Sequence, residues 1–287
     1  MYTTLLSGIL SGIGIGSIFA LIAIGVSIFY RGTGIVNMAH GSTIMVSGFI
    51  AVEVSSHLGS PLATLVVAAV AGAVIGALLF LAVMAPLRTR ITAGGFGWVA
   101  LTLAVMFILG GVAALIWGED SRPLPALANG GYHIGPAYVS WQKTIAFIIL
   151  IAVVVLLWWM LMHTTVGRML RASAADGVGA VSVGINRTSA QTVSMAISGA
   201  LAGLVACLML PIDGVTPESG LSLTMVGLSA AVLGRIGNIP GAALGGLALG
   251  VVTQVVSGFW PSWTTVAEFS VLLIGIVARP GQLKMEG

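Results

Sequence analysis

Charged side chains are scarce in this sequence. Asp, Glu, Lys and Arg make up only 7% of its 287 residues, while 58% are hydrophobic. Soluble domains carry about 25% charged residues, so the composition excludes an ordinary water-soluble protein. Several apolar runs exceed the roughly 20 residues that a helix needs to cross the hydrocarbon of a bilayer. We therefore predict an all-α fold, a polytopic transmembrane helix bundle.

Chemistry-bearing motifs are also lacking. Cys207 is the single cysteine, which excludes an intramolecular disulfide, and no Cys/His cluster has metal-ligand spacing. The chain has no GxxxxGK[ST] phosphate loop, and its four scattered histidines form no nucleophile–base set. We predict no metal site, no cofactor and no catalytic residues, so the protein is not expected to be an enzyme.

The basic residues are few and dispersed. Eleven Lys and Arg against eight Asp and Glu give a net charge of +3, but a nucleic-acid partner needs clustered charge. Their places at segment ends indicate membrane topology instead. No basic residue precedes Arg31, and the first apolar run is longer than the core of a signal peptide, so we expect no cleaved leader.

Apolar runs separated by polar or Gly/Pro breakers predict eight to ten spans in one transmembrane domain covering residues 1–287. The second is interrupted, and the seventh is too short to cross alone, as a half-helix would be. A polar segment at 118–140 and a more polar one at 163–189 separate the middle runs. The predicted spans are 5–30, 36–57, 61–87, 96–117, 141–162, 190–210, 221–233, 240–258 and 264–278.

Orientation follows from the positions of Lys and Arg, which favour the cytoplasmic side. Basic loops alternate with basic-poor or acidic ones, which predicts an outside N-terminus, a cytoplasmic C-terminus and a cytoplasmic loop at 163–189. The basic positions are Arg88, Arg90, Arg168, Arg171, Arg187, Arg235, Arg279 and Lys284, and the acidic ones are Glu119, Asp120, Asp213 and Glu218.

Forty glycines would destabilise soluble helices, but small residues let membrane helices approach closely. Several recur at four-residue spacing, which predicts tight helix–helix packing. They are Gly8, Gly12, Gly16 and Ala20, then Gly72 with Gly76, Gly199 with Gly203, and Gly241 with Gly245.

The stretch "RGTGIVNMAHGS" at 31–42 concentrates polar residues between two apolar runs. Its glycines weaken the helix. Backbone N–H and C=O groups that lose their helical hydrogen bonds inside the membrane must line a cavity or be covered by protein. Asn37 and His40 could then offer donors and acceptors to a passing solute. The alternative is a cytoplasmic turn with Arg31 as a membrane anchor, and the spacing leaves both open.

Two acids lie within predicted spans. Glu53 and His57 are one helical turn apart and could face each other, and Glu268 lies inside the last span. An ionisable group within the membrane is a functional hypothesis by default, although both acids are close enough to an interface to reach water. They leave open an ion-coupled secondary carrier.

The loop "TTVGRMLRASAADGVGAVSVGINRTSA" predicts one short helix and a turn. Arg168 and Arg171 are spaced for one face, and Gly184 breaks the pattern before Ile185. A compact, alanine-rich helix of this kind suits docking on a partner, while an amphipathic segment lying on the membrane is the alternative.

Three segments together resemble the branched-chain amino-acid permease family of ABC importers, the high-affinity Liv type. "GIGIGSIFALIAIGVSIFYRGTGIVNMAHGS" is similar to the family's opening, with its "N-x-A-H-G" element at 37–41. "GRMLRASAADGVGAVSVGIN" resembles its cytoplasmic segment, and "AVLGRIGNIPGAALGGLALG" its late glycine signature. The resemblance covers nearly the whole chain in the same order.

This resemblance implies a permease subunit of a bacterial inner-membrane ABC importer. The partners would be cytoplasmic ATPase subunits, a second permease, an external solute-binding protein and membrane lipid. Branched-chain amino acids are the expected cargo, with urea, amides and small carboxylic or aromatic acids as alternatives. The implied ATPase-coupling residues are Arg168, Arg171, Asp176, Gly184 and Ile185, and the implied pathway residues are Asn37, His40, Arg31 and Glu53.

Two arginines depart from the family pattern. Arg235 stands where glycine is common, and could add an ATPase or lipid contact on the cytoplasmic side. Arg31 replaces a common small residue, and would favour a carboxylate or other anion if it reaches the pathway and act as an anchor if it does not.

Overall fold

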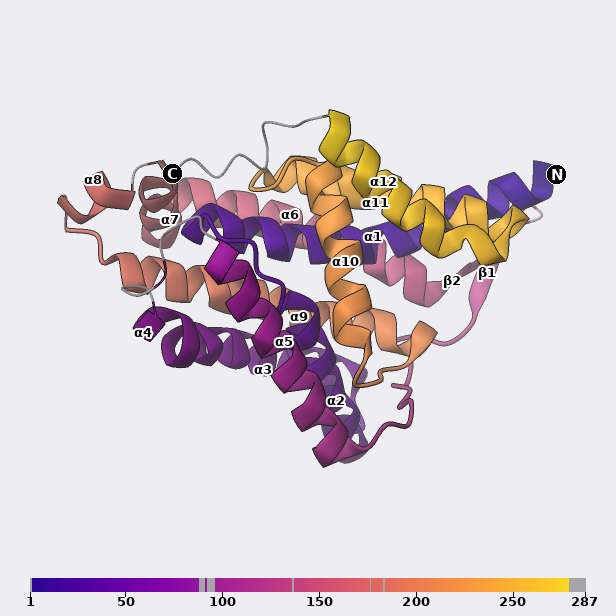
Figure 1. The fold of residues 1–287 in the computed structure, drawn as a ribbon. Coiled ribbons are helices and arrows are strands. Elements are labelled where there is room, and N and C mark those ends of the chain that lie inside the picture. Colours follow the sequence, from indigo (N-terminus) through magenta and orange to yellow (C-terminus); the bar gives the residue numbers. More distant parts are fainter. Residues whose placement is uncertain are drawn as a thin grey trace.

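The computed structural model describes residues 2–87, 91, 96–135, 137–175, 177–182 and 184–278 and has the form of a bundle of long helices with one small hairpin (Figure 1). The all-α polytopic class is therefore confirmed. Within these residues six helices are long and apolar enough to cross a bilayer. The predicted count of eight to ten spans is not confirmed.

The elements follow the predicted runs closely, and segments 61–87 and 96–117 have the predicted ends. They are α1 (Tyr2–Thr33), α2 (His40–Leu58), α3 (Pro61–Leu79), the π-helical turn η1 (Phe80–Met84), α4 (Ala85–Leu87), α5 (Phe96–Trp117), β1 (Gly131–Ile134), β2 (Ala137–Ser140), α6 (Trp141–His163), α7 (Thr165–Ala175), α8 (Gly177–Ser182), α9 (Arg187–Asp213), α10 (Ser219–Leu233), α11 (Ile239–Phe259), the 3₁₀ turn η2 (Pro261–Trp263) and α12 (Thr264–Ala278).

A two-stranded hairpin occupies the end of the polar segment 118–140. Strands β1 and β2 pair antiparallel, with Gly131 opposite Ser140. An isolated bridge between Arg122 and Val215 ties the preceding loop to the end of α9. The sequence predicted only a polar connection here, because strands of four residues carry too little periodicity to identify.

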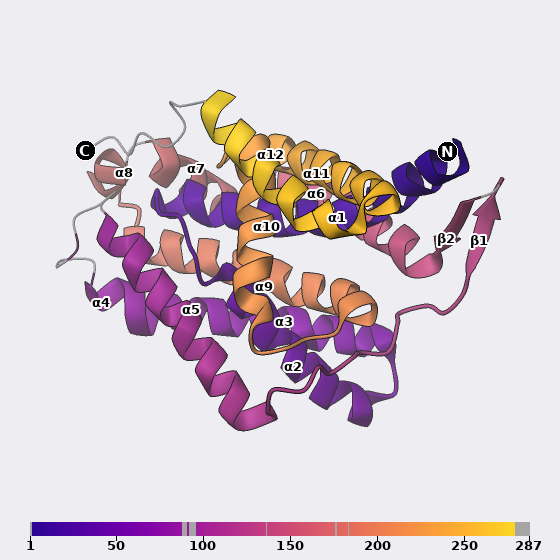
Figure 2. The ribbon, with the colours of Figure 1, turned by 45° about the vertical axis from the view of Figure 1, so that its right-hand side comes forward.

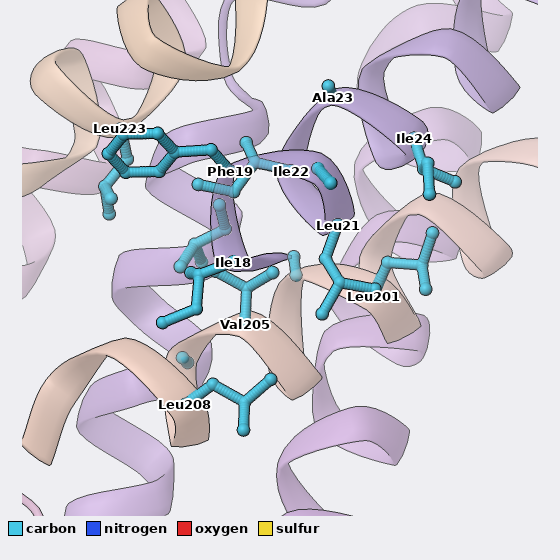
Figure 3. Packing of buried hydrophobic residues seen from close by; sticks show 14 of the residues in the cluster. Ile18, Phe19, Leu21, Ile22, Ala23, Ile24, Leu201, Val205, Leu208 and Leu223 are labelled. Carbon is cyan, nitrogen blue, oxygen red and sulfur yellow. The ribbon is translucent and has the colours of Figure 1, made fainter. Parts of the chain in front are cut away.

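Helix α1 forms the centre of the bundle and packs chiefly against α11 and α9. In its most apolar window 78% of residues are buried, against 67% for α9 and 22% for α3 and α5. A helix that is apolar on all sides is buried inside a protein or spans a membrane, and α1 does both. Figure 3 shows Leu21 of α1 close to Leu201 of α9, and Phe19 close to Leu223 of α10.

Glycines bring these helices into backbone contact, as their spacing predicted. A methyl group added at Gly72 of α3 would overlap the carbonyl of Gly199 in α9, and one added at Gly199 would overlap Gly72. Between α1 and α11 the contact is equally close: a methyl group added at Gly250 would overlap the backbone of Gly16, and one added at Gly16 would overlap the backbone of Leu247. Contact at this distance replaces side-chain interdigitation with backbone packing.

The bundle has two distinct ends (Figures 1 and 2). The N-terminus and the β1–β2 hairpin lie at one end, while α7 and α8 lie at the opposite end. Helix α10 runs across the bundle between α5 and α12 in both views, and its 15 residues match the predicted half-helix.

We predict that Gly72→Ala destabilises the protein and that Gly111→Ala does not. The added methyl at Gly72 meets backbone that cannot turn aside, and overpacking of this kind costs about 1–3 kcal/mol. Gly111 also lies inside a helix, α5, but has no atom within 4 Å of an added Cβ. The thermal unfolding midpoint of each purified variant measures the difference, and equal midpoints would contradict the assigned α3–α9 contact.

Candidate functional site

The polar stretch at 31–42 is a break between two helices. Helix α1 ends at Thr33, where Gly34 takes a positive φ of 73°. The hydroxyl of Thr33 donates to the carbonyl of Phe29 at 2.8 Å and accepts from the amide of Ile35 at 3.1 Å. Residues 34–39 are not helical, and α2 begins at His40. The chain is therefore interrupted within 31–42, as predicted, but α2 itself is continuous to Leu58, so the second span is not a broken helix.

Two threonines from other helices satisfy the backbone of this break. The amide of Met38 donates to the hydroxyl of Thr102 in α5 at 3.2 Å. The hydroxyl of Thr224 in α10 accepts from the amide of Gly41 at 3.0 Å and lies 2.9 Å from the carbonyl of Met38. Neither threonine was predicted as a site residue, because a lone Thr in an apolar helix carries no periodic signal.

Asn37 shapes the turn that leads into α2. Its side chain is 2% exposed, and its Oδ1 accepts from the amide of Ala39 at 2.9 Å. Its Nδ2 points to the Sδ of Met195 in α9 at 3.6 Å. Asn side chains commonly hydrogen-bond the backbone two residues further on in turns. In this conformation both the oxygen and the nitrogen of the Asn37 side chain have a partner.

His40, the first residue of α2, lies between α1 and α9. It is 1% exposed, and its Nδ1 is 3.1 Å from the hydroxyl of Ser198. Its Nε2 has no hydrogen-bond partner and faces Gly25, where an added Cβ would lie 2.7 Å from it. Gly25 thus leaves room for the imidazole, and His40 carries one unused buried nitrogen.

The other two predicted pathway residues lie elsewhere. Glu53 is exposed on α2, and the 13 residues that separate it from His40 correspond to about 20 Å of helix. Between the side chains of Glu53 and His57, both described, the structure gives no hydrogen bond or ion pair. Arg31 lies in the last turn of α1, where it lines a cleft that includes Arg171 but not Asn37.

The predicted coupling segment contains two short helices, α7 and α8, where one helix and a turn were expected. In α7, Leu170 and Gly167 are buried against the bundle, Arg168 is exposed and Arg171 is half-buried. The guanidinium of Arg171 contacts the Sδ of Met162 at 3.4 Å. The two arginines therefore do not share one exposed face.

Gly184 ends α8 in a recognisable cap. Its φ is 82°, and the amide of Ile185 reaches back to the carbonyl of Ala180 at 3.0 Å, the 6→1 bond of a Schellman motif. A side chain at Gly184 would be strained in this conformation. Asp176, the remaining predicted coupling residue, lies outside the described residues, as do Arg88, Arg90, Arg279 and Lys284.

Comparison with known proteins identifies the group to which this helix bundle belongs. A family model described as the permease component of the branched-chain amino acid transport system matches residues 8–278. The chain belongs to this family. The permease is thus a multi-pass membrane protein and a transport subunit rather than an enzyme.

Curated relatives cover almost the whole permease. The high-affinity branched-chain amino acid permease protein BraD of Pseudomonas aeruginosa is 29% identical, over 96% of this chain and 94% of its own. LivH of Escherichia coli K12 is 28% identical, over 94% and 92%. The probable LivH of Methanocaldococcus jannaschii is also 28% identical, over 86% and 79%.

A solved structure shares the fold. PsaBC from Streptococcus pneumoniae, in complex with a Fab, superposes with a TM-score of 0.55 and covers 99% of each chain at 16% identity. At that identity the likeness concerns the helix arrangement alone.

We predict that Thr224→Val destabilises the permease more than Thr253→Val. Valine keeps the shape of threonine, but at 224 it leaves the amide of Gly41 and the carbonyl of Met38 without this partner. A buried group left unsatisfied costs about 1–3 kcal/mol. Thr253 is equally buried, yet its hydroxyl bonds only to Leu249 of its own helix. Thermal unfolding of the two variants tests this, and equal loss would remove the special role of Thr224.

Proposed function

We propose that this permease is the membrane-spanning subunit of a bacterial ABC importer for branched-chain amino acids. The observation that carries the proposal is the family match over residues 8–278. The relatives named as high-affinity branched-chain amino acid permeases support it, because they cover more than nine-tenths of the chain. Urea, amides and small carboxylic or aromatic acids are the alternative cargoes.

The proposal includes partners and an orientation. Separate ATP-binding cassette subunits power transport, an external binding protein delivers the solute, and a second permease, identical or homologous, completes the membrane part. The chain lies in the inner membrane with the α7–α8 end in the cytoplasm. This is supported by the arginines gathered at that end, since cytoplasmic loops carry an excess of Lys and Arg.

We also propose that the break between α1 and α2 belongs to the translocation pathway. Interrupted helices are how many transporters present polar groups near the middle of the membrane. In the described conformation Asn37 and His40 are buried and bonded within the subunit. Their exposure to solute therefore requires a shift of α9 or α1 relative to α2, which an ATP-driven cycle can supply.

Reconstituted transport tests the cargo. The permease is co-expressed with its candidate ATPase and binding protein, and uptake of labelled leucine into vesicles is compared with uptake of urea and a small carboxylate. Leucine uptake that requires ATP is the expected result. Preference for urea or the carboxylate would show that branched-chain amino acids are not the cargo. Uptake without ATP or ATPase would contradict the proposed ABC importer and favour a secondary carrier using Glu53 or Glu268.

We predict that Gly184→Val reduces co-purification of the ATPase, whereas Gly118→Val does not. Both glycines have a φ close to 80° and open space around them, so valine imposes the same backbone strain at each. Gly184 lies in the proposed coupling segment, whereas Gly118 follows α5 and lies outside that segment. Equal ATPase recovery with both variants would remove Gly184 from coupling.

A further inference from the structure

A cleft of about 620 Å³ opens at the α7–α8 end of the permease. Its walls come from three parts of the chain that are distant in sequence, which are the end of α1, helix α7 with the start of α9, and the turn between α10 and α11. Each part contributes at least one arginine, and the four are Arg31, Arg171, Arg187 and Arg235.

Within the described residues, the positive charge that lines this cleft has no acidic counterpart. Among the described residues that line it, none is an aspartate or a glutamate, and the structure gives none of the four guanidinium groups a carboxylate partner within the described residues. Three of the four side chains are half-buried, so water screens them less than it screens free surface arginines. Four like charges around one cavity repel each other unless an anion lies between them.

Two polar atoms beside the cleft also lack partners. The Nε of Arg171 and the hydroxyl of Ser173 are buried without a hydrogen bond, and both residues line the cleft. Buried donors are nearly always satisfied in native proteins. The lining of the cleft therefore includes two donors whose hydrogen-bonding capacity is unused.

The backbone of Arg235, which lines the same cleft, is strained. Its φ of 72° is the one positive value that a non-glycine residue takes in the described part of the chain. The turn is held by bonds from the amide of Arg235 to Val232 and from the amide of Asn238 to Arg235. Strain of this kind costs about 1–3 kcal/mol and concentrates at functional sites.

We propose that the four-arginine cleft binds a phosphate-bearing anion. Arginine offers forked donors that match phosphate oxygens, and four guanidinium groups with a serine hydroxyl exceed what a single carboxylate can use. The cleft lies at the end of membrane-spanning helices, which is the depth of lipid headgroups. The source is therefore an acidic phospholipid or a free phosphate compound.

The shape of the site argues against the ATPase as its occupant. A partner that docks on α7 would meet its outer face, where Arg168 is exposed and does not line the cleft. The four arginines instead surround a concavity between α7 and the ends of α1 and α10. A phosphate there would join these three elements by charge-assisted hydrogen bonds.

The test uses the purified full-length permease in zwitterionic detergent. Phosphatidylglycerol in mixed micelles and inorganic pyrophosphate are titrated separately, and binding is followed by the rise in unfolding midpoint and by lipid retained in native mass spectrometry. One basic contact to an anionic surface corresponds to about a fivefold change in affinity. We expect Arg235→Gln to weaken binding about fivefold and the Arg171→Gln/Arg235→Gln double variant about 30-fold, with Arg168→Gln within twofold of the wild type.

The ligand series separates the two sources. Binding of phosphatidylglycerol alone assigns a lipid headgroup, and binding of pyrophosphate assigns a free phosphate compound. Because Arg235 is exposed and supports no packing, its single variant keeps the test valid if the double variant fails to fold. The proposal is overturned if the wild type binds neither probe, or if Arg168→Gln loses as much affinity as Arg235→Gln. It is equally overturned if the cleft variants lose only the ATPase and keep wild-type anion affinity.

Discussion

The need to satisfy backbone hydrogen bonds away from water governs this structure. In a bilayer each unpaired amide or carbonyl costs several kcal/mol, so a chain that leaves the helix must find partners in its neighbours. Residues 34–39 leave it, and the hydroxyls of Thr102 and Thr224 supply the partners. Because these two residues come from α5 and α10, the break also determines where those helices pack.

The apolar membrane environment also explains the glycine contacts. Lipid tails are as apolar as leucine, so helices in a membrane gain little from burying side chains and much from close approach. The Gly72–Gly199 contact brings the backbones of α3 and α9 together, and the Gly16–Gly250 contact brings α11 against the central helix α1. His40 fits into this centre because Gly25 leaves space for its ring, so the polar break and the glycine packing depend on each other.

Hydropathy in the sequence was sufficient for the long helices, the half-helix α10 and the interruption before His40. It was not sufficient for contacts between distant residues. Thr224 bonds to Met38, which lies 186 positions away in the sequence, and no local sequence pattern predicts such a pair. The β1–β2 hairpin and the second helix of the 163–189 segment were missed because both are too short to show a period. The arginines of the cleft were visible one at a time, as topology signals, but their convergence is a property of the fold.

The end of α1 connects the two polar regions of the permease. Arg31 lines the arginine cleft, and only two residues later Thr33 ends the helix and starts the break. A ligand that draws α7 towards Arg31 acts on the same helical turn that sets the direction of residues 34–39. The turn is stabilised by local bonds from Thr33 and Gly34, whereas the start of α2 is held by α5, α9 and α10. Displacement of α7 therefore reaches His40 through the six non-helical residues 34–39. This short segment is thus the place where motion at the α7–α8 end can alter the centre of the bundle.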